Sequence, residues 1–204
     1  MNRRLILRLL AALAVAPASY VMAAALPGQP APAFELADAD GRPVRLADLR
    51  GRFVVLEWNN PACPFVQKHY GSGNMQALQK RYTAANVVWL TINSTARSHP
   101  EYLSPAQMAA WIKQQGAAPS AVLLDSDGKV GRAYGARTTP HMYVIDPNGV
   151  LVYAGAIDDK RSANPADVKS AQNYVVAALA DAMAGKPVGI GHTQAYGCSI
   201  KYAD

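Results

Sequence analysis

The sequence lacks an uninterrupted apolar run long enough to cross a membrane. Its most apolar segment, residues 5–16, is shorter than the roughly 20 residues that a spanning helix requires. Arg3 and Arg4 precede this segment, Arg8 interrupts it, and three alanines follow at positions 23–25. The order basic, apolar, small is that of a secretory leader, so residues 1–25 are predicted to be a signal peptide, cleaved near residues 23–25.

A cleaved leader would leave a mature protein without a membrane span, in the periplasm or secreted. Arg3 and Arg4 also resemble the twin-arginine export pattern, although Asn2 stands where serine or threonine is usual. Both export routes remain open, and an uncleaved amino-terminal anchor is the alternative.

The sequence also lacks a long cationic stripe interleaved with aromatic residues. The formal net charge is +6, but the leader holds three arginines and no acid, so the mature body would carry +3. Such a mildly basic body excludes nucleic acid as the expected partner. Half of the chain is hydrophobic, which favours a compact body over a disordered one.

Cysteine is scarce, because Cys63 and Cys198 are the only two. In an oxidising compartment a pair can form a disulfide, whereas a lone thiol is at risk of oxidation. The presence of each cysteine therefore calls for a structural or chemical role.

Residues 26–187 are predicted to form one α/β domain, and residues 188–204 a glycine-rich C-terminal tail that carries Cys198. Apolar runs bounded by turn residues predict buried strands, and helical spacing between them predicts crossover helices on both sheet faces. The turn at residues 147–149 predicts an antiparallel hairpin. The expected strands cover residues 53–58, 86–93, 121–125, 141–146 and 150–158; helices are expected from 64, with a break at 71–73, from 105, over 129–134 and over 165–184.

Cys63 directly follows a predicted strand and precedes Pro64, which favours the first position of a helix. Unpaired amide groups and the positive end of the helix dipole stabilise a thiolate at such a place. The sequence therefore predicts a reactive thiol, with a buried inert thiol as the alternative.

The segment FVVLEWNNPACPFV resembles the redoxin pattern of an apolar strand, an aromatic residue and Cys-Pro-x-Cys, and RTTPHMYVIDPNGVLVYAGAIDD is similar to the strand and hairpin that follow that family's cis-proline. The terminal YGCSIKY resembles the tail of one subgroup. The chain is thus similar to the thioredoxin superfamily, in its alkyl hydroperoxide reductase and thiol-specific antioxidant branch, specifically the peroxiredoxin-like group. The resemblance implies a thioredoxin-like fold with a central mixed sheet and a C-terminal extension.

In this resemblance Cys63 stands at the place of the nucleophilic cysteine, and Val66 replaces the second cysteine of Cys-x-x-Cys. The chain therefore cannot form the Cys-x-x-Cys disulfide that completes the exchange reaction of an ordinary thioredoxin. Against the peroxiredoxin pattern Pro-x-x-x-Thr-x-x-Cys, Leu56 replaces the proline and Asn60 the threonine. Asn60 is expected to donate a hydrogen bond to a peroxide or thiolate.

Pro140 matches the cis-proline of the family, which implies that the Thr139 backbone lies opposite Cys63 and is open to a substrate. Arg137 is the nearest candidate for the arginine that polarises a peroxide, and an exposed loop arginine is the alternative. Cys198 is implied to resolve a Cys63 sulfenic acid into a disulfide. A permanent structural disulfide and an unpaired Cys198 remain alternatives.

Two histidines raise a copper alternative, since thiolate and imidazole suit that metal. His69 and His141 are the candidates, but related copper proteins use two closely spaced cysteines, and only Cys63 lies near the helix. Lys68 and His69 are more simply interpreted as solvent-facing helix residues, and Asp158-Asp159 as a loop turn or cap.

The sequence therefore predicts an exported thiol oxidoreductase that needs no cofactor or metal. A peroxide is the first candidate substrate and a protein disulfide the second, with an unknown thiol as reductant. The competing hypothesis is a non-enzymatic thioredoxin-fold module with a structural disulfide or a copper-binding role.

Overall fold

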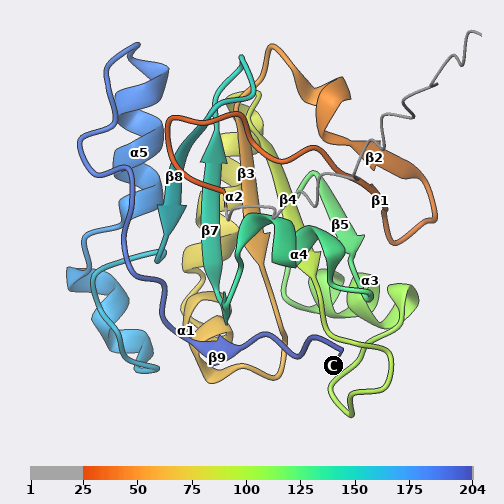
Figure 1. The fold of residues 1–204 in the computed structure, drawn as a ribbon. Helices are drawn as coiled ribbons and strands as arrows, with labels where there is room; N and C mark the ends of the chain where they lie inside the picture. The colour runs from red at the N-terminus through yellow and green to blue at the C-terminus, as the bar shows by residue number, and fades with distance from the viewer. Residues whose placement is uncertain (1–24, 204) are drawn as a thin grey trace, which may run out of the picture.

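The computed structural model describes residues 25–203, and a five-stranded mixed sheet forms their centre (Figure 1). The strand order is β5-β4-β3-β7-β8. The strands are β3 (Val54–Trp58), β4 (Val88–Asn93), β5 (Ala121–Leu124), β7 (His141–Ile145) and β8 (Leu151–Gly155). β3, β4 and β5 run parallel, whereas β7 is antiparallel to both β3 and β8. The predicted mixed sheet with one terminal hairpin is confirmed.

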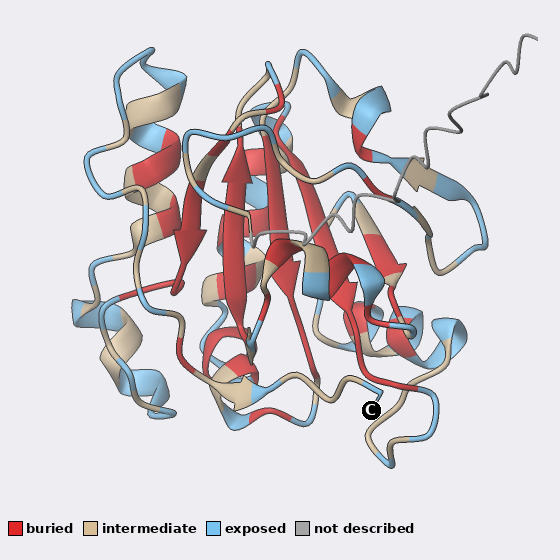
Figure 2. Ribbon diagram, viewed as in Figure 1, coloured by how far each residue is buried: buried red, intermediate tan, exposed pale blue. Residues whose placement is uncertain are grey.

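Helices cover both faces of this sheet. The helices α1 (Pro64–Gly71), α2 (Asn74–Ala84) and α5 (Tyr174–Met183) pack on one face, and α4 (Lys129–Tyr134) packs with the 3-10 helix η1 (Leu46–Leu49) on the other. α3 (Pro105–Gln114) packs beside the edge strand β5. Successive side chains of a strand point to opposite faces, so Val54 and Val55 enter different apolar clusters. Figure 2 shows the resulting buried sheet.

Two small sheets lie outside the central one. β1 (Glu35–Ala37) and β2 (Pro43–Arg45) form a short antiparallel hairpin before β3. β6 (Thr138–Thr139) pairs with β9 (Cys198–Ser199), so the C-terminal segment, residues 188–203, returns to the main body. No pattern in the sequence predicted this second pairing, because it joins segments far apart in the chain.

Local sequence signals set two of the helix boundaries, and the break predicted at residues 71–73 is confirmed. Ser104 caps α3 with a reciprocal capping box to Gln107, which satisfies two otherwise unpaired backbone donors. The chain breaks between α1 and α2 at Gly73, whose φ of 75° lies in the left-handed region that glycine tolerates.

The single helix predicted over residues 165–184 is wrong. Residues Pro165–Ser170 form the 3-10 helix η2, and α5 begins only after Asn173. Asn164 caps η2, and Asn173 provides a second cap by accepting from the Val176 amide. Between the caps, the Gln172 amide donates to the Asp159 side chain at 2.9 Å, which holds the backbone out of helical geometry.

The predicted signal peptide lies outside the described residues, apart from Ala25. Within residues 25–203, every helix is too short or too polar to cross a bilayer.

Candidate functional site

Cys63 lies in the turn that joins the end of β3 to the start of α1. It is the N-cap residue of α1, and Pro64 occupies the first helical position. The Cys63 amide donates to the Asn60 carbonyl at 3.0 Å, and the Cys63 carbonyl accepts from the Gln67 amide at 2.9 Å. The predicted placement of this cysteine at a helix N-terminus is confirmed.

The Cys63 side chain is 2% exposed and does not hydrogen-bond to the amides of α1. Its Sγ instead donates to the Thr139 carbonyl at 3.0 Å. A sulfur donates such a bond only while it carries its proton. The thiolate stabilised by helix amides therefore stays a prediction.

The residues opposite Cys63 are Thr139 and Pro140, as the resemblance implied. The Thr139 backbone is covered by β9, however, and is not open to a substrate as expected. The peptide bond between them is cis. Thr139 is buried, and its hydroxyl has no hydrogen-bond partner among the described residues. A buried polar group without a partner costs free energy, so this hydroxyl is an unsatisfied polar group on the residue whose carbonyl contacts Cys63.

Cys198 lies next to Cys63 and packs against the same apolar cluster. Antiparallel pairing of β9 with β6 sets Cys198 opposite Thr139, whose carbonyl also accepts from Cys63. Burial, together with the neighbouring Cys63 thiol, raises the pKa of Cys198 to about 12. At neutral pH Cys198 therefore keeps its proton, and both cysteines are free thiols.

The other two predicted polar residues make different contacts. The Asn60 side chain donates to Glu101 at 2.6 Å and accepts from the Ala62 amide. The bond to Glu101 competes with the role expected for Asn60 toward a peroxide, which stays a prediction. Arg137 is exposed and lines a cavity of about 440 Å³ with Thr138 and His141. Its role toward a peroxide is also untested.

The interpretation of Lys68 and His69 as solvent-facing residues is wrong, because both are buried. The Lys68 Nζ forms an ion pair with Asp158 at 3.4 Å and donates to the Lys160 carbonyl at 2.7 Å. The Tyr196 hydroxyl donates to Asp158. The helical spacing of α1 could not predict this burial, because η2 and the C-terminal segment cover this part of α1 only in the folded chain.

Glu57 is a second buried charge that the sequence analysis did not single out. It lies on β3, and its carboxylate accepts hydrogen bonds from five side chains: Asn59, Tyr70, Gln79, Trp89 and Thr91. Burial raises the pKa of Glu57, and the hydrogen bonds from Trp89, Asn59, Tyr70 and Thr91 act against that rise. A lone acid inside the apolar run FVVLEW was the signal that could have revealed this network.

Acid is expected to destabilise the protein through its buried histidines. Burial lowers the pKa of His69 to about 4 and that of His141 to about 3, from 6.5 in the unfolded chain. Between pH 6.5 and 4 the unfolded state binds more protons, so the free energy of unfolding falls as pH falls, by up to about 1.4 kcal/mol per pH unit for each histidine. Urea unfolding from pH 7 to 4.5 measures this slope.

The single variants His69→Gln and His141→Gln are each expected to flatten that slope. Burial raises the pKa of Glu57 and Asp125, which opposes the histidines at low pH. These carboxyl groups remain in the variants, so the difference between slopes isolates each histidine. Equal slopes for variant and parent would contradict the assignment.

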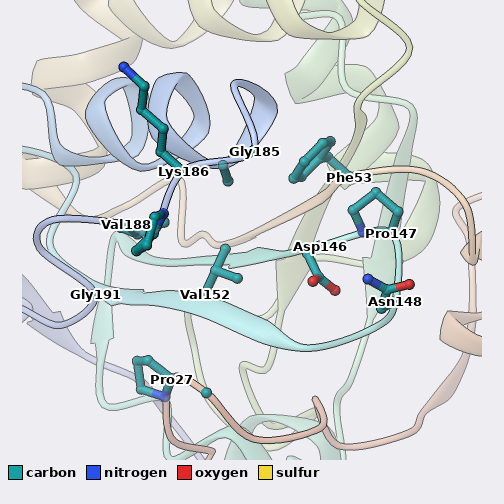
Figure 3. A pocket seen from close by; sticks show the side chains of 13 residues that line it. Pro27, Phe53, Asp146, Pro147, Asn148, Val152, Gly185, Lys186, Val188 and Gly191 are labelled. Carbon is teal, nitrogen blue, oxygen red and sulfur yellow. The ribbon is translucent and has the colours of Figure 1, made fainter.

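A cavity of about 650 Å³ lies away from the cysteines (Figure 3). It is lined by Phe53, Val152 and Val188, and by the turn between β7 and β8. Phe53 precedes β3 whereas Cys63 follows it, so this cavity lies toward the opposite end of that strand. Among residues 25–203, no cluster of three or more His, Cys, Asp or Glu side chains is placed to hold a metal ion.

Comparison with known proteins agrees with this geometry. Residues 27–154 match the AhpC/TSA family. A Mycobacterium tuberculosis protein provisionally named a peroxiredoxin is 31% identical over 137 residues, which are 65% of this chain and 78% of that protein.

Two solved structures show the same fold. An uncharacterised conserved protein from Geobacillus kaustophilus superposes with a TM-score of 0.74 and 30% identity, over 87% of this chain and 92% of its own. The thioredoxin domain of a thiol-disulfide oxidoreductase from Bacteroides vulgatus has a TM-score of 0.51 and 21% identity, over 71% and 96%. At that identity the second likeness shows the fold alone.

The sheet, the cis-proline and the cysteine at the start of α1 define a thioredoxin-fold protein. Within this class, the chain belongs to the AhpC/TSA family. The family points to thiol-dependent oxidoreductase activity in general.

Proposed function

We propose that this protein reduces peroxides with two cysteines, Cys63 as nucleophile and Cys198 as resolving thiol. The observation that carries the proposal is the position of Cys198. β9 holds it opposite Thr139, the residue whose carbonyl accepts from Cys63. Two neighbouring free thiols suit a reaction that ends in a disulfide between them.

In the first step the Cys63 thiolate attacks one peroxide oxygen. The O–O bond breaks, an S–O bond forms, and the leaving oxygen takes a proton to become an alcohol or water. Cys63 is thereby oxidised to a sulfenic acid, while the peroxide is reduced.

In the second step Cys198 attacks the Cys63 sulfur. The S–O bond breaks, an S–S bond forms, and the hydroxyl group leaves as water with the proton of Cys198. The high pKa of Cys198 keeps it a thiol until this step. An external thiol reductant then supplies two electrons, restores both cysteines and becomes a disulfide itself.

The C-terminal segment also favours a second candidate function, disulfide exchange with another protein. β9 shows that the backbone of β6 accepts an extended strand carrying a cysteine. A partner peptide in place of β9 would meet Cys63 in the same way. If the parent protein does not reduce peroxide but exchanges disulfides with a partner peptide, this candidate is favoured.

We also propose that the protein is exported, which rests on the basic, apolar and small-residue order of residues 1–25. An oxidising compartment would suit a chain whose residues 188–204 act as a tail that delivers Cys198 to a redoxin domain at 26–187. Determining the first residue of the mature protein by N-terminal sequencing tests the predicted cleavage.

Treating the reduced protein with one equivalent of hydrogen peroxide at pH 7 is expected to give one intramolecular disulfide between Cys63 and Cys198. The product is measured by intact mass and peptide mapping, and mild reductants are expected to reverse it. In Cys198→Ser the sulfenic acid on Cys63 is expected to persist, where dimedone traps it. A pair that peroxide does not oxidise, or a disulfide that resists mild reductants, would instead support a structural disulfide.

A further inference from the structure

The C-terminal segment is fixed on both sides of Cys198. On the amino-terminal side the Tyr196 ring packs edge-on against Phe65 of α1, with ring centroids 5.7 Å apart. On the carboxyl side the Lys201 carbonyl accepts from the Ala96 amide at 2.7 Å, and the Tyr202 hydroxyl donates to the Ala136 carbonyl at 2.8 Å. Cys198 therefore lies in a segment tied to the domain at two places.

The Tyr196 side chain places its hydroxyl in a buried cluster of charged groups. The hydroxyl donates to Asp158, and it lies 3.4 Å from the Lys68 Nζ and 3.5 Å from the His69 Nε2. Asp158 is 2% exposed, Lys68 1% and Tyr196 7%. Burial and the bond to Asp158 raise the pKa of Tyr196, so its hydroxyl keeps the proton that it donates.

A buried ion pair is stable only when its remaining hydrogen-bonding sites are satisfied. Lys68 has Asp158, the Lys160 carbonyl and the Tyr196 hydroxyl as partners. Asp158 receives Tyr196 and Lys68 as donors, and also the Lys160 amide at 3.0 Å. Withdrawal of Tyr196 would remove one partner from each buried charge, which makes its departure costly.

This cluster connects the two cysteines mechanically. Lys68 lies on α1, the helix that Cys63 caps, and Tyr196 precedes Cys198 by a single intervening residue, Gly197. Figure 1 shows the C-terminal segment passing the start of α1 on its way to β9. The contacts of Tyr196 with Phe65 and Lys68 of α1 therefore restrict where Cys198 can lie relative to Cys63.

We propose that Lys68, Asp158 and Tyr196 form a tail anchor whose function is to position Cys198 against Cys63. The three are positioning residues, and the inference rests on the proposed function of the cysteine pair. Holding two reacting groups together raises their effective concentration and so speeds the step that joins them. The anchor thus accelerates attack of the Cys198 sulfur on the Cys63 sulfenic acid, with release of water.

The anchor also decides between two fates of oxidised Cys63. A sulfenic acid that is not captured by a thiol reacts with a second peroxide molecule to give sulfinic acid, which most thiol systems cannot reduce. Loss of the anchor slows capture by Cys198 without touching the attack of Cys63 on the first peroxide. Sensitivity to excess peroxide is therefore a readout that a merely structural role would leave unchanged.

The test uses Tyr196→Phe, which removes the hydroxyl and keeps the ring against Phe65. The first readout is equilibrium with reduced and oxidised glutathione, which gives the effective concentration of the cysteine pair whether or not peroxide is a substrate. We expect it to fall at least about tenfold in the variant. Asp158→Asn, which removes the charge and keeps the size, is expected to cause a similar fall.

The second readout is rapid-quench mass spectrometry after peroxide addition. In Tyr196→Phe the sulfenic acid is expected to form at the parent rate, the disulfide at least about tenfold more slowly, and sulfinic acid to accumulate. Tyr82→Phe is the matched control, because it deletes the hydroxyl of another buried tyrosine, in α2. It is expected to match the parent.

The outcomes separate the two proposals. An unchanged effective concentration in both anchor variants overturns the tail anchor, whatever peroxide does. A tenfold fall in effective concentration together with a parent protein inert to peroxide supports the anchor and overturns peroxide reduction. An equal fall in Tyr82→Phe would mean that general loosening of the fold is responsible, which also overturns the anchor.

Discussion

Cys63→Ser is expected to lower peroxide turnover by at least about 10³-fold, to the level of the uncatalysed reaction. A serine hydroxyl has no thiolate form near neutral pH and is a weak nucleophile without an adjacent base. The substitution changes one atom in a side chain that is 2% exposed, so the fold is expected to survive. Turnover is measured by peroxide consumption with a dithiol reductant in excess.

Cys198→Ser is the matched control, since it removes the neighbouring sulfur. It is expected to retain the first oxidation of Cys63 and to lose the intramolecular disulfide. Circular dichroism on both variants establishes that the sheet and helices persist. Turnover by folded Cys63→Ser at the parent rate would refute the assignment of Cys63 as nucleophile.

Gly197→Ala is expected to slow formation of the Cys63–Cys198 disulfide by about 100-fold. Gly197 has φ +137°, and a Cβ built there would lie 2.0 Å from the Thr139 carbonyl oxygen. That contact is far below any van der Waals distance, and its partner is backbone that cannot rotate away. The added methyl must therefore move β9 off β6 and carry Cys198 away from Cys63. Quenched-flow alkylation after one equivalent of peroxide measures the rate.

Gly185→Ala controls for backbone strain without the steric clash. Gly185 also has a positive φ, +70°, but a Cβ there would meet no atom within 4 Å. The control is expected to form the disulfide at the parent rate. Disulfide formation by Gly197→Ala as fast as by Gly185→Ala would show that pairing of β9 with β6 is not needed.

Much of the fold follows from short-range signals in the chain. Bounded apolar runs predicted the five strands of the central sheet, because each is buried on both faces. The capping box at Ser104 and the break at Gly73 are equally local. The predicted long helix at 165–184 failed because contacts with the segment after β8 hold residues 171–173 out of helical geometry.

The candidate site divides in the same way. The position of Cys63 at the start of α1 could be predicted, since a strand, a cysteine and a proline are consecutive. The cis bond before Pro140 was implied by the family resemblance alone. The buried pair of Lys68 and Asp158 could not be predicted, because a lysine on a helix is ordinarily solvated and its partner lies 90 residues away.

The sequence by itself determined the order of strands and helices and the place of the candidate nucleophile, because both depend on neighbours within a few residues. Only the tertiary structure decided which residues surround that sulfur. In the folded chain β9 pairs with β6, Cys198 lies opposite Thr139, and the Tyr196 hydroxyl donates to the buried Asp158. Those contacts join distant parts of the chain, and their free energy exists only once the sheet has brought α1 and the end of β8 together.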